Sequence, residues 1–254
     1  LPSMEIFVQT PLGLIPYALE DLNPFAQVDG PSWLWDRRPN PILIRKELMM
    51  FSIDADRIGV AIADVSGKGI AASILMVICQ THLRHISREH TSPANVLKAI
   101  NLEMQKSMRQ DMFITVVYAI IDIQSGQITI ARAGHELPFY FDSKLKGGKV
   151  QKIHSGGMAL GMVPPEIFDL TIKDTVLPFN PGDALMLYTD GVTESINTQG
   201  DEYSSERLLK VFQEAGHKDA QDIQQSIQDT FGVAQNFHLA KVRKIISYAL
   251  ILPN

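Results

Sequence analysis

The sequence predicts an α+β domain in which antiparallel sheets are covered by helices. Strand-like stretches outnumber helical ones, and most successive strands are joined by short turns. No internal repeat or low-complexity segment interrupts this pattern. With 254 residues, 45% of them hydrophobic, the chain is long enough to bury the core of one domain.

The first 40 residues read as an irregular lead-in segment. Six prolines punctuate it, and both tryptophans, Trp33 and Trp35, lie close together. Proline removes a backbone donor and fixes the backbone, so repeated prolines disfavour regular elements. We therefore expect a lead-in segment over residues 1–40 and a folded domain over residues 41–254.

The next part of the chain alternates between strand and helix signals. Ser92 followed by Pro93 is typical of a helix start, because Ser caps the helix and Pro suits its first position. The expected elements are a hairpin of strands 42–53 and 58–63, a glycine turn 64–69, and helices over 70–88 and 92–109.

The rest of the chain returns to period two before closing with helices. Short turns, such as the one over residues 180–183, separate its strands. The expected strands cover residues 113–123, 128–133, 137–141, 150–153, 168–177, 184–188 and 245–252, and the expected helices cover residues 204–215 and 219–231.

Composition excludes several classes of protein. The net charge of -5 offers no basic face for nucleic acid or anionic lipid. Cys79 is the single cysteine, so no disulfide forms within the chain and a reducing compartment is the simpler interpretation. No apolar run approaches the roughly 20 residues that span a bilayer. The chain opens with Leu1 rather than Met, which leaves room for an upstream domain.

Two stretches share one form, an apolar strand that ends in an aspartate followed by a glycine turn. Asp64 ends the first and Asp190 ends the second. A carboxylate at the end of a buried strand is partly desolvated, which is costly unless a cation or several donors satisfy it. Hard divalent ions prefer such oxygen ligands. Each aspartate alone could instead cap a helix or turn, but the pair favours a metal site.

The turn around Lys68 and Gly69 could attract phosphate, because the exposed N–H groups of a helix start favour anions. It lacks the spacing of a nucleotide-binding P-loop. The histidines form no zinc set: His82 and His85 are three residues apart on one expected helix, and His135 follows a strand as a structural hydrogen-bonding residue.

Six stretches, taken together, resemble the SpoIIE-like branch of the metal-dependent (PPM, or 2C-type) serine/threonine protein phosphatases. They follow the family's order and spacing over most of the chain, roughly residues 50 to 215. The stretches are Ile62–Ala72, Phe113–Ala119, Ala131–His135, Ala159–Gly161, Pro181–Asp183 and Tyr188–Glu194.

This resemblance implies an α-β-β-α sandwich of two antiparallel sheets between helical layers. It also implies two Mn²⁺ or Mg²⁺ ions, with Asp64 bridging both, the backbone carbonyl of Val65 as a further ligand, and Asp190 binding one ion. Water activated by the two ions would attack a phosphoserine or phosphothreonine in line. Lys68 and Gly69 would help to orient the phosphate.

The family's substrates and partners set further expectations. Its members often dephosphorylate small regulators such as anti-sigma-factor antagonists, and often carry an upstream sensor or receiver domain. We therefore expect a cytoplasmic signalling enzyme whose partner is a phosphorylated regulatory protein. Nothing in the sequence indicates the oligomeric state.

Two acids of the family pattern are missing. The first is expected near residues 44–46, which read Ile-Arg-Lys, and the second near residues 242–244, which read Val-Arg-Lys. Asp29 or Asp36 could replace the first acid if an insertion follows it. The alternative hypothesis is a catalytically impaired phosphatase-like module that binds a phosphorylated regulator or senses a signal.

Overall fold

The computed structural model describes residues 6–10, 13–17, 46–67, 69–106, 108–109, 111–197, 199–232 and 247–251. The chain divides into two units. The first unit takes residues 1–19, 136–154 and 179–254, and the second takes residues 20–135 and 155–178. Each unit has an antiparallel sheet and helices, so the expected α+β class is confirmed.

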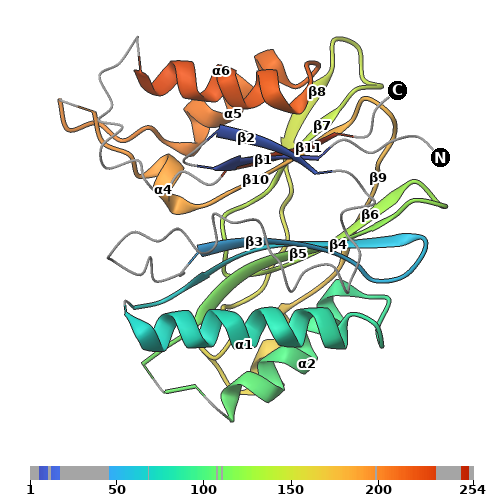
Figure 1. The fold of residues 1–254 in the computed structure, drawn as a ribbon, viewed down its shortest axis with the longest axis vertical. Helices are drawn as coiled ribbons and strands as arrows, with labels where there is room; N and C mark the ends of the chain where they lie inside the picture. The colour runs from blue at the N-terminus through green and yellow to red at the C-terminus, as the bar shows by residue number, and fades with distance from the viewer. Residues whose placement is uncertain are drawn as a thin grey trace. The chain divides into compact units, whose positions relative to one another are not determined.

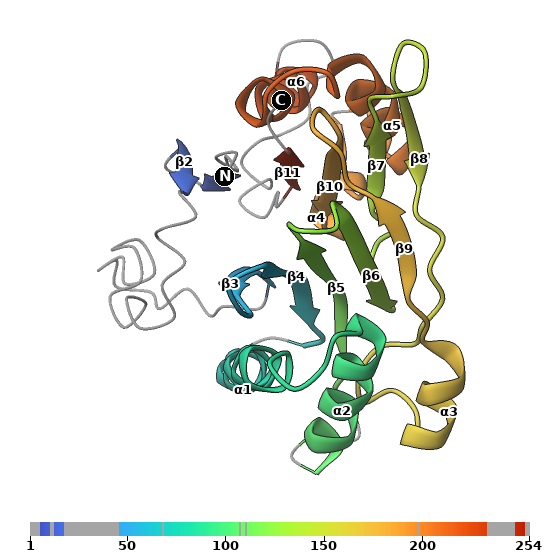
Figure 2. The same cartoon turned by 90° about the vertical axis from the view of Figure 1, so that its right-hand side faces the viewer.

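The second unit contains a five-stranded sheet with helices against one face (Figures 1 and 2). Its elements in chain order are β3 (Lys46–Ser52), β4 (Arg57–Val65), α1 (Ile70–Ile86), α2 (Pro93–Gln105), β5 (Ile114–Asp122), β6 (Gln127–Ala133), α3 (Pro165–Thr171) and β9 (Thr175–Pro178). The strands lie in the order β3-β4-β5-β6-β9, each antiparallel to its neighbours.

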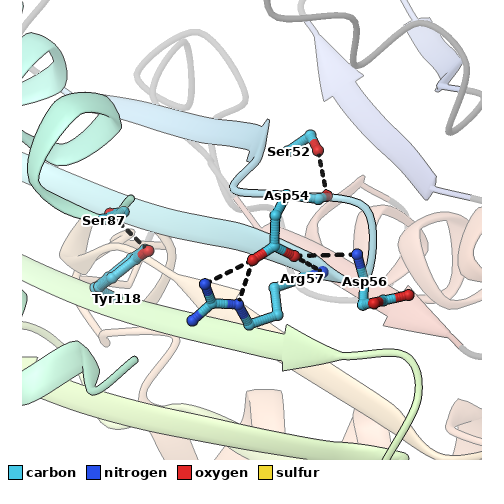
Figure 3. A network of polar contacts seen from close by, with 6 residues as sticks. All are labelled: Ser52, Asp54, Asp56, Arg57, Ser87 and Tyr118. Carbon is cyan, nitrogen blue, oxygen red and sulfur yellow. Dashed lines mark hydrogen bonds and ion pairs between the residues drawn. The ribbon is translucent and has the colours of Figure 1, made fainter. Parts of the chain in front are cut away.

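The β3–β4 hairpin is closed by a carboxylate (Figure 3). Asp54 accepts hydrogen bonds from the backbone N–H groups of Asp56 (3.0 Å) and Arg57 (2.9 Å), and from Nε of Arg57 (2.7 Å). The side-chain hydrogen bond from Arg57 is the main reason that the pKa of Asp54 lies below its ordinary value. These contacts fix the turn and therefore the register of β4, the strand that carries Asp64.

A second polar contact in Figure 3 joins β5 to the end of α1. The buried hydroxyl of Tyr118 donates to Oγ of Ser87 over 2.8 Å, and Ser87 in turn donates to the carbonyl of Leu83. Burial raises the pKa of the Tyr118 hydroxyl, so it stays neutral and acts as a structural donor. Cys79 is also fully buried in this core, as is usual for a cysteine that acts as a small apolar residue.

The start of α2 follows the sequence signal closely. Oγ of Ser92 accepts the backbone N–H of Asn95 over 3.1 Å, and Pro93 occupies the first turn. The carboxylate of Asp174 then accepts from Oγ of Ser92 (2.5 Å) and from the N–H of Ala94 (2.8 Å). The expected cap at Ser92 is confirmed, and a distant acid strengthens it.

One expected element is wrong. The alternation of apolar and polar residues over 168–177 predicts a strand, but the structure has α3 followed by the short strand β9. Pro165 suits the first turn of a helix. Phe168 and Ile172, four residues apart, are buried, whereas Leu170 is 79% exposed. The burial therefore has the helical period, and the apparent period of two came from an exposed leucine.

The first unit contains a six-stranded antiparallel sheet. Its elements are β1 (Ile6–Thr10), β2 (Gly13–Tyr17), β7 (Phe139–Asp142), β8 (Lys149–Lys152), β10 (Ala184–Tyr188), α4 (Asp190–Thr193), α5 (Ser205–Ala215), α6 (Ala220–Gly232) and β11 (Ser247–Ile251). The strands lie in the order β2-β1-β11-β10-β7-β8, so the last strand of the chain pairs between β1 and β10. Alternate residues of β7 and β10 pack with α5 and α6 in one core.

Strands β1 and β2 fall within the segment that the sequence describes as an irregular lead-in. Most of residues 1–40 lie outside the described residues, so the boundary between lead-in and domain stays a prediction. Within the described residues, none of the helices has both the length and the apolar character needed to cross a bilayer.

Candidate active site

Asp64 lies one residue before the end of β4, between two neighbouring strands. The register places Thr115 of β5 opposite it on one side and Lys46 of β3 opposite it on the other. Ala63 and Val65 belong to the core beneath α1, and successive strand residues point to opposite faces. The half-buried Asp64 therefore points to the face of the sheet away from α1.

The chain turns sharply after Asp64 and enters α1. Ser66 fixes this turn, because its N–H donates to the carbonyl of Phe113 (2.9 Å) and its Oγ accepts the N–H of Phe113 (2.7 Å). Gly69 precedes the helix and offers no side-chain cap to its first N–H groups. Lys68, the other residue expected to orient phosphate, lies outside the described residues.

Asp190 follows β10 and is the first residue of the short helix α4. Its carbonyl accepts the N–H of Glu194 (2.8 Å) and Oγ1 of Thr193 (3.3 Å), which closes the turn. Its side chain is half-buried. The strand-to-aspartate form expected for this stretch is confirmed, and a short helical turn follows it.

Asp64 belongs to the second unit and Asp190 to the first. The expected convergence of the two carboxylates therefore stays a prediction. Asp29, Asp36 and the basic residues at 243 and 244 lie outside the described part of the chain.

The sequence did not predict a hydrogen-bonded pair beside Asp64, which consists of Thr115 and His135. Oγ1 of Thr115 lies 2.9 Å from Nδ1 of His135 and 3.4 Å from the backbone oxygen of Asp64. His135 does make the structural hydrogen bond expected of it, but its partner was unknown. Only the β4–β5 register, which places Thr115 opposite Asp64, shows that this contact belongs to the site.

A divalent cation is the group that the family resemblance implies, and the donors here allow a test of its fit. Asp64 and Val65 offer carboxylate and carbonyl oxygens, which suit a hard cation. In the β3–β4 register, Lys46 is the residue paired with Asp64. Across the described ranges, no three His, Cys, Asp or Glu side chains gather to hold a metal. The oxygen donors at this strand end therefore fit a hard divalent cation.

The comparisons with known proteins identify the family of the chain. The family model described as Stage II sporulation protein E (SpoIIE) matches residues 54–240, which include β4, the glycine turn and Asp190. The chain belongs to the SpoIIE family. The expected membership in the SpoIIE-like branch of the PPM phosphatases is thereby confirmed.

Two relatives of this chain are named as phosphoserine phosphatases. Phosphoserine phosphatase RsbU of Bacillus subtilis is 31% identical over 189 residues, which cover 74% of this chain and 54% of RsbU. Phosphoserine phosphatase RsbP of the same organism is 26% identical over 148 residues, which cover 57% of this chain and 35% of RsbP. The chain thus spans about half of the length of RsbU and about a third of the length of RsbP.

Solved structures share the fold of this chain. The SiaA-PP2C domain of Pseudomonas aeruginosa superimposes with a TM-score of 0.66 at 17% identity, covering 82% of this chain and 80% of that one. RsbX, solved in complex with magnesium, superimposes with a TM-score of 0.57 at 15% identity, covering 81% of this chain and 85% of that one. These likenesses confirm the expected PPM phosphatase-like fold.

Proposed function

We propose that this chain is the phosphatase domain of a signalling protein and removes phosphate from phosphoserine or phosphothreonine of a regulatory protein. The observation that carries the proposal is the placement of Asp64, at the end of an inner strand and directly before the glycine turn into α1. The family match over residues 54–240 and the likeness to phosphoserine phosphatase RsbU support it.

In this proposal the carboxylates of Asp64 and Asp190 and the carbonyl of Val65 hold Mn²⁺ or Mg²⁺. A divalent cation bound there lowers the pKa of water and offsets charge on the phosphoryl group. The first N–H groups of α1, which have no acceptor within the helix, orient the phosphate together with Lys68 and Gly69, because a helix start favours anions.

The substrate and setting follow from the relatives by analogy. An anti-sigma-factor antagonist phosphorylated on serine or threonine is the substrate class that we propose, and an upstream sensor or receiver domain is the regulator. Cytoplasmic placement belongs to the same proposal, since such partners act inside the cell. Protease protection of the protein in intact cells is the measurement that checks it, and digestion there contradicts it.

A second candidate function rests on the register of Lys46. Two unit charges about 4 Å apart interact by roughly 4 kcal/mol at an effective dielectric near 20. At the position of Lys46 the family pattern has an acid, which attracts a metal ion. A lysine there repels the ion instead. The domain would then bind a phosphorylated regulator without hydrolysing its phosphate, and Lys46 favours this alternative.

Turnover decides between the two functions. We expect the protein to hydrolyse a phosphoserine peptide and p-nitrophenyl phosphate with added Mn²⁺, and Asp64→Asn to lose at least about 100-fold in rate, because the neutral amide is a poor ligand for a hard cation. Thermal unfolding of both proteins checks that the variant is folded. Equal background rates in the two proteins leave only the binding module.

Lys46→Asp tests the charge argument on its own. Replacing the lysine paired with Asp64 by an aspartate is expected to raise the affinity for Mn²⁺ about tenfold or more, measured by calorimetry. Lys210→Asp, which makes the same charge change at an exposed position of α5, is the control and is expected to leave the affinity within about twofold. A similar gain in both variants would show that net charge alone attracts the ion.

A further inference from the structure

The turn after β6 is fastened beside Asp64 by side-chain hydrogen bonds. The guanidinium of Arg132 donates from Nε to the carbonyl of Ser155 (2.7 Å) and from Nη1 to the carbonyl of His135 (2.5 Å). His135 is only 7% exposed, and its Nδ1 lies 2.9 Å from Oγ1 of Thr115. His135 is therefore held both at its backbone carbonyl and at its imidazole ring.

Backbone contacts brace the same turn against the start of β5. The N–H of Gly134 donates to the carbonyl of Gly157 over 2.9 Å, and a parallel bridge joins Gly134 to Val116. Leu160 pairs with Ile114 in both directions, at 2.8 and 3.0 Å. Ile114 precedes Thr115 in β5. The turn after β6, the loop over residues 157–160 and the start of β5 therefore form one connected support.

Thr115 links this support to Asp64. It sits opposite Asp64 in the β4–β5 register, and its hydroxyl donates to the backbone oxygen of Asp64 over 3.4 Å. A hydroxyl has a single proton. When the hydroxyl of Thr115 donates this proton to Asp64, its Oγ1 accepts a hydrogen bond from Nδ1–H of His135. The hydrogen bonds then run from the imidazole through Thr115 to Asp64 at the end of β4.

We propose that His135 is a positioning residue for Asp64 and acts through Thr115. The inference rests on the proposed function in so far as Asp64 binds a divalent cation. Groups behind a metal ligand fix its orientation, and their loss costs about 10-fold to 100-fold in metal affinity or activity. Thr115, on the neighbouring strand β5, and His135, just after β6, stand behind the main chain of Asp64 in this sense.

Paired substitutions separate positioning from general support. Thr115→Val removes the hydroxyl at nearly constant volume, and His135→Phe removes both ring nitrogens. We expect each to weaken Mn²⁺ binding about tenfold by calorimetry and to lower kcat for p-nitrophenyl phosphate with little change in KM. The double variant is expected to lose no more than either single one, because both break the same link.

Conservative variants supply the matched controls. Thr115→Ser keeps the hydroxyl, and His135→Asn keeps an N–H donor near the place of Nδ1, so both are expected to retain Mn²⁺ affinity within about threefold. Thermal unfolding is measured on every variant. Losses that follow the unfolding midpoint rather than the hydroxyl and the N–H donor would overturn the proposal, and so would full additivity of Thr115→Val and His135→Phe.

Hydrogen exchange separates failure of this inference from failure of the proposed function. If the wild-type protein neither binds Mn²⁺ nor turns over substrate, the proposed function is wrong. The amides of residues 64–66 still decide the positioning role: we expect about tenfold faster exchange in Thr115→Val and His135→Phe, and wild-type rates in Thr115→Ser. Equal exchange in all four proteins contradicts the link.

Discussion

Gly157→Ala is expected to destabilise the protein by about 4 kcal/mol or more. Gly157 has φ = +136°, a conformation that side chains rarely adopt. A Cβ there would lie 1.9 Å from the backbone oxygen of Arg132, which cannot swing away as a side chain can. The loop must therefore leave the end of β6 and lose its hydrogen bond to Gly134. Urea unfolding followed by circular dichroism measures the loss.

Gly147→Ala is the matched control for this substitution. Gly147 also has positive φ, at +80°, but no heavy atom lies within 4 Å of its would-be Cβ. We expect it to cost only the 1–2 kcal/mol or so of left-handed backbone strain. If both variants lose the same stability, backbone conformation alone explains the result and the close approach of the loop to Arg132 does not matter.

Asp183→Ala is expected to cost about 3 kcal/mol of unfolding free energy. Asp183 is fully buried before β10, and its carboxylate accepts the hydroxyl of Tyr140 (2.7 Å) and the backbone N–H of Asn180 (2.7 Å). It also accepts the N–H (2.9 Å) and Oγ (2.7 Å) of Ser143. Removing the acceptor leaves several donors without a partner, and each such buried group costs about 1–3 kcal/mol.

The comparison variant for Asp183→Ala is Asp201→Ala. Asp201 is exposed, and its carboxylate accepts a side-chain hydrogen bond from Asn197 over 3.1 Å. Because water replaces that contact in the variant, we expect a loss below about 1 kcal/mol. Chemical denaturation of the two variants under one set of conditions gives both values. Similar losses would mean that the buried network around Asp183 adds little stability.

The same network predicts how stability depends on pH. Burial alone raises the pKa of Asp183, but the hydrogen bonds from Tyr140, Asn180 and Ser143 outweigh it, so the pKa lies below the ordinary value of 3.8. The unfolded chain then binds the proton first, and the stability from Asp183 is lost as the pH falls below about 3.8 through the folded pKa. Asp183→Asn should lose less stability than the wild type between pH 5 and pH 2 in denaturant titrations.

Local sequence signals predicted most elements because their causes are local. Ser92 and Pro93 predicted α2, and the turn at Asp54 predicted the hairpin, because in each case the residues that form the contact are neighbours in the chain. The same logic failed at α3. There the exposed Leu170 completed an apparent strand pattern, and only the burial of Phe168 and Ile172 shows the helix.

The sequence by itself determined the family, the α+β class, and the two aspartates at strand ends, because motif spacing and alternation are properties of the chain. Only the tertiary structure decided what stands beside Asp64. Lys46 and Thr115 are 18 and 51 residues away in sequence, and they become its neighbours through strand register. Register depends on the packing of whole faces, and a slip of one residue would turn Asp64 into the core instead.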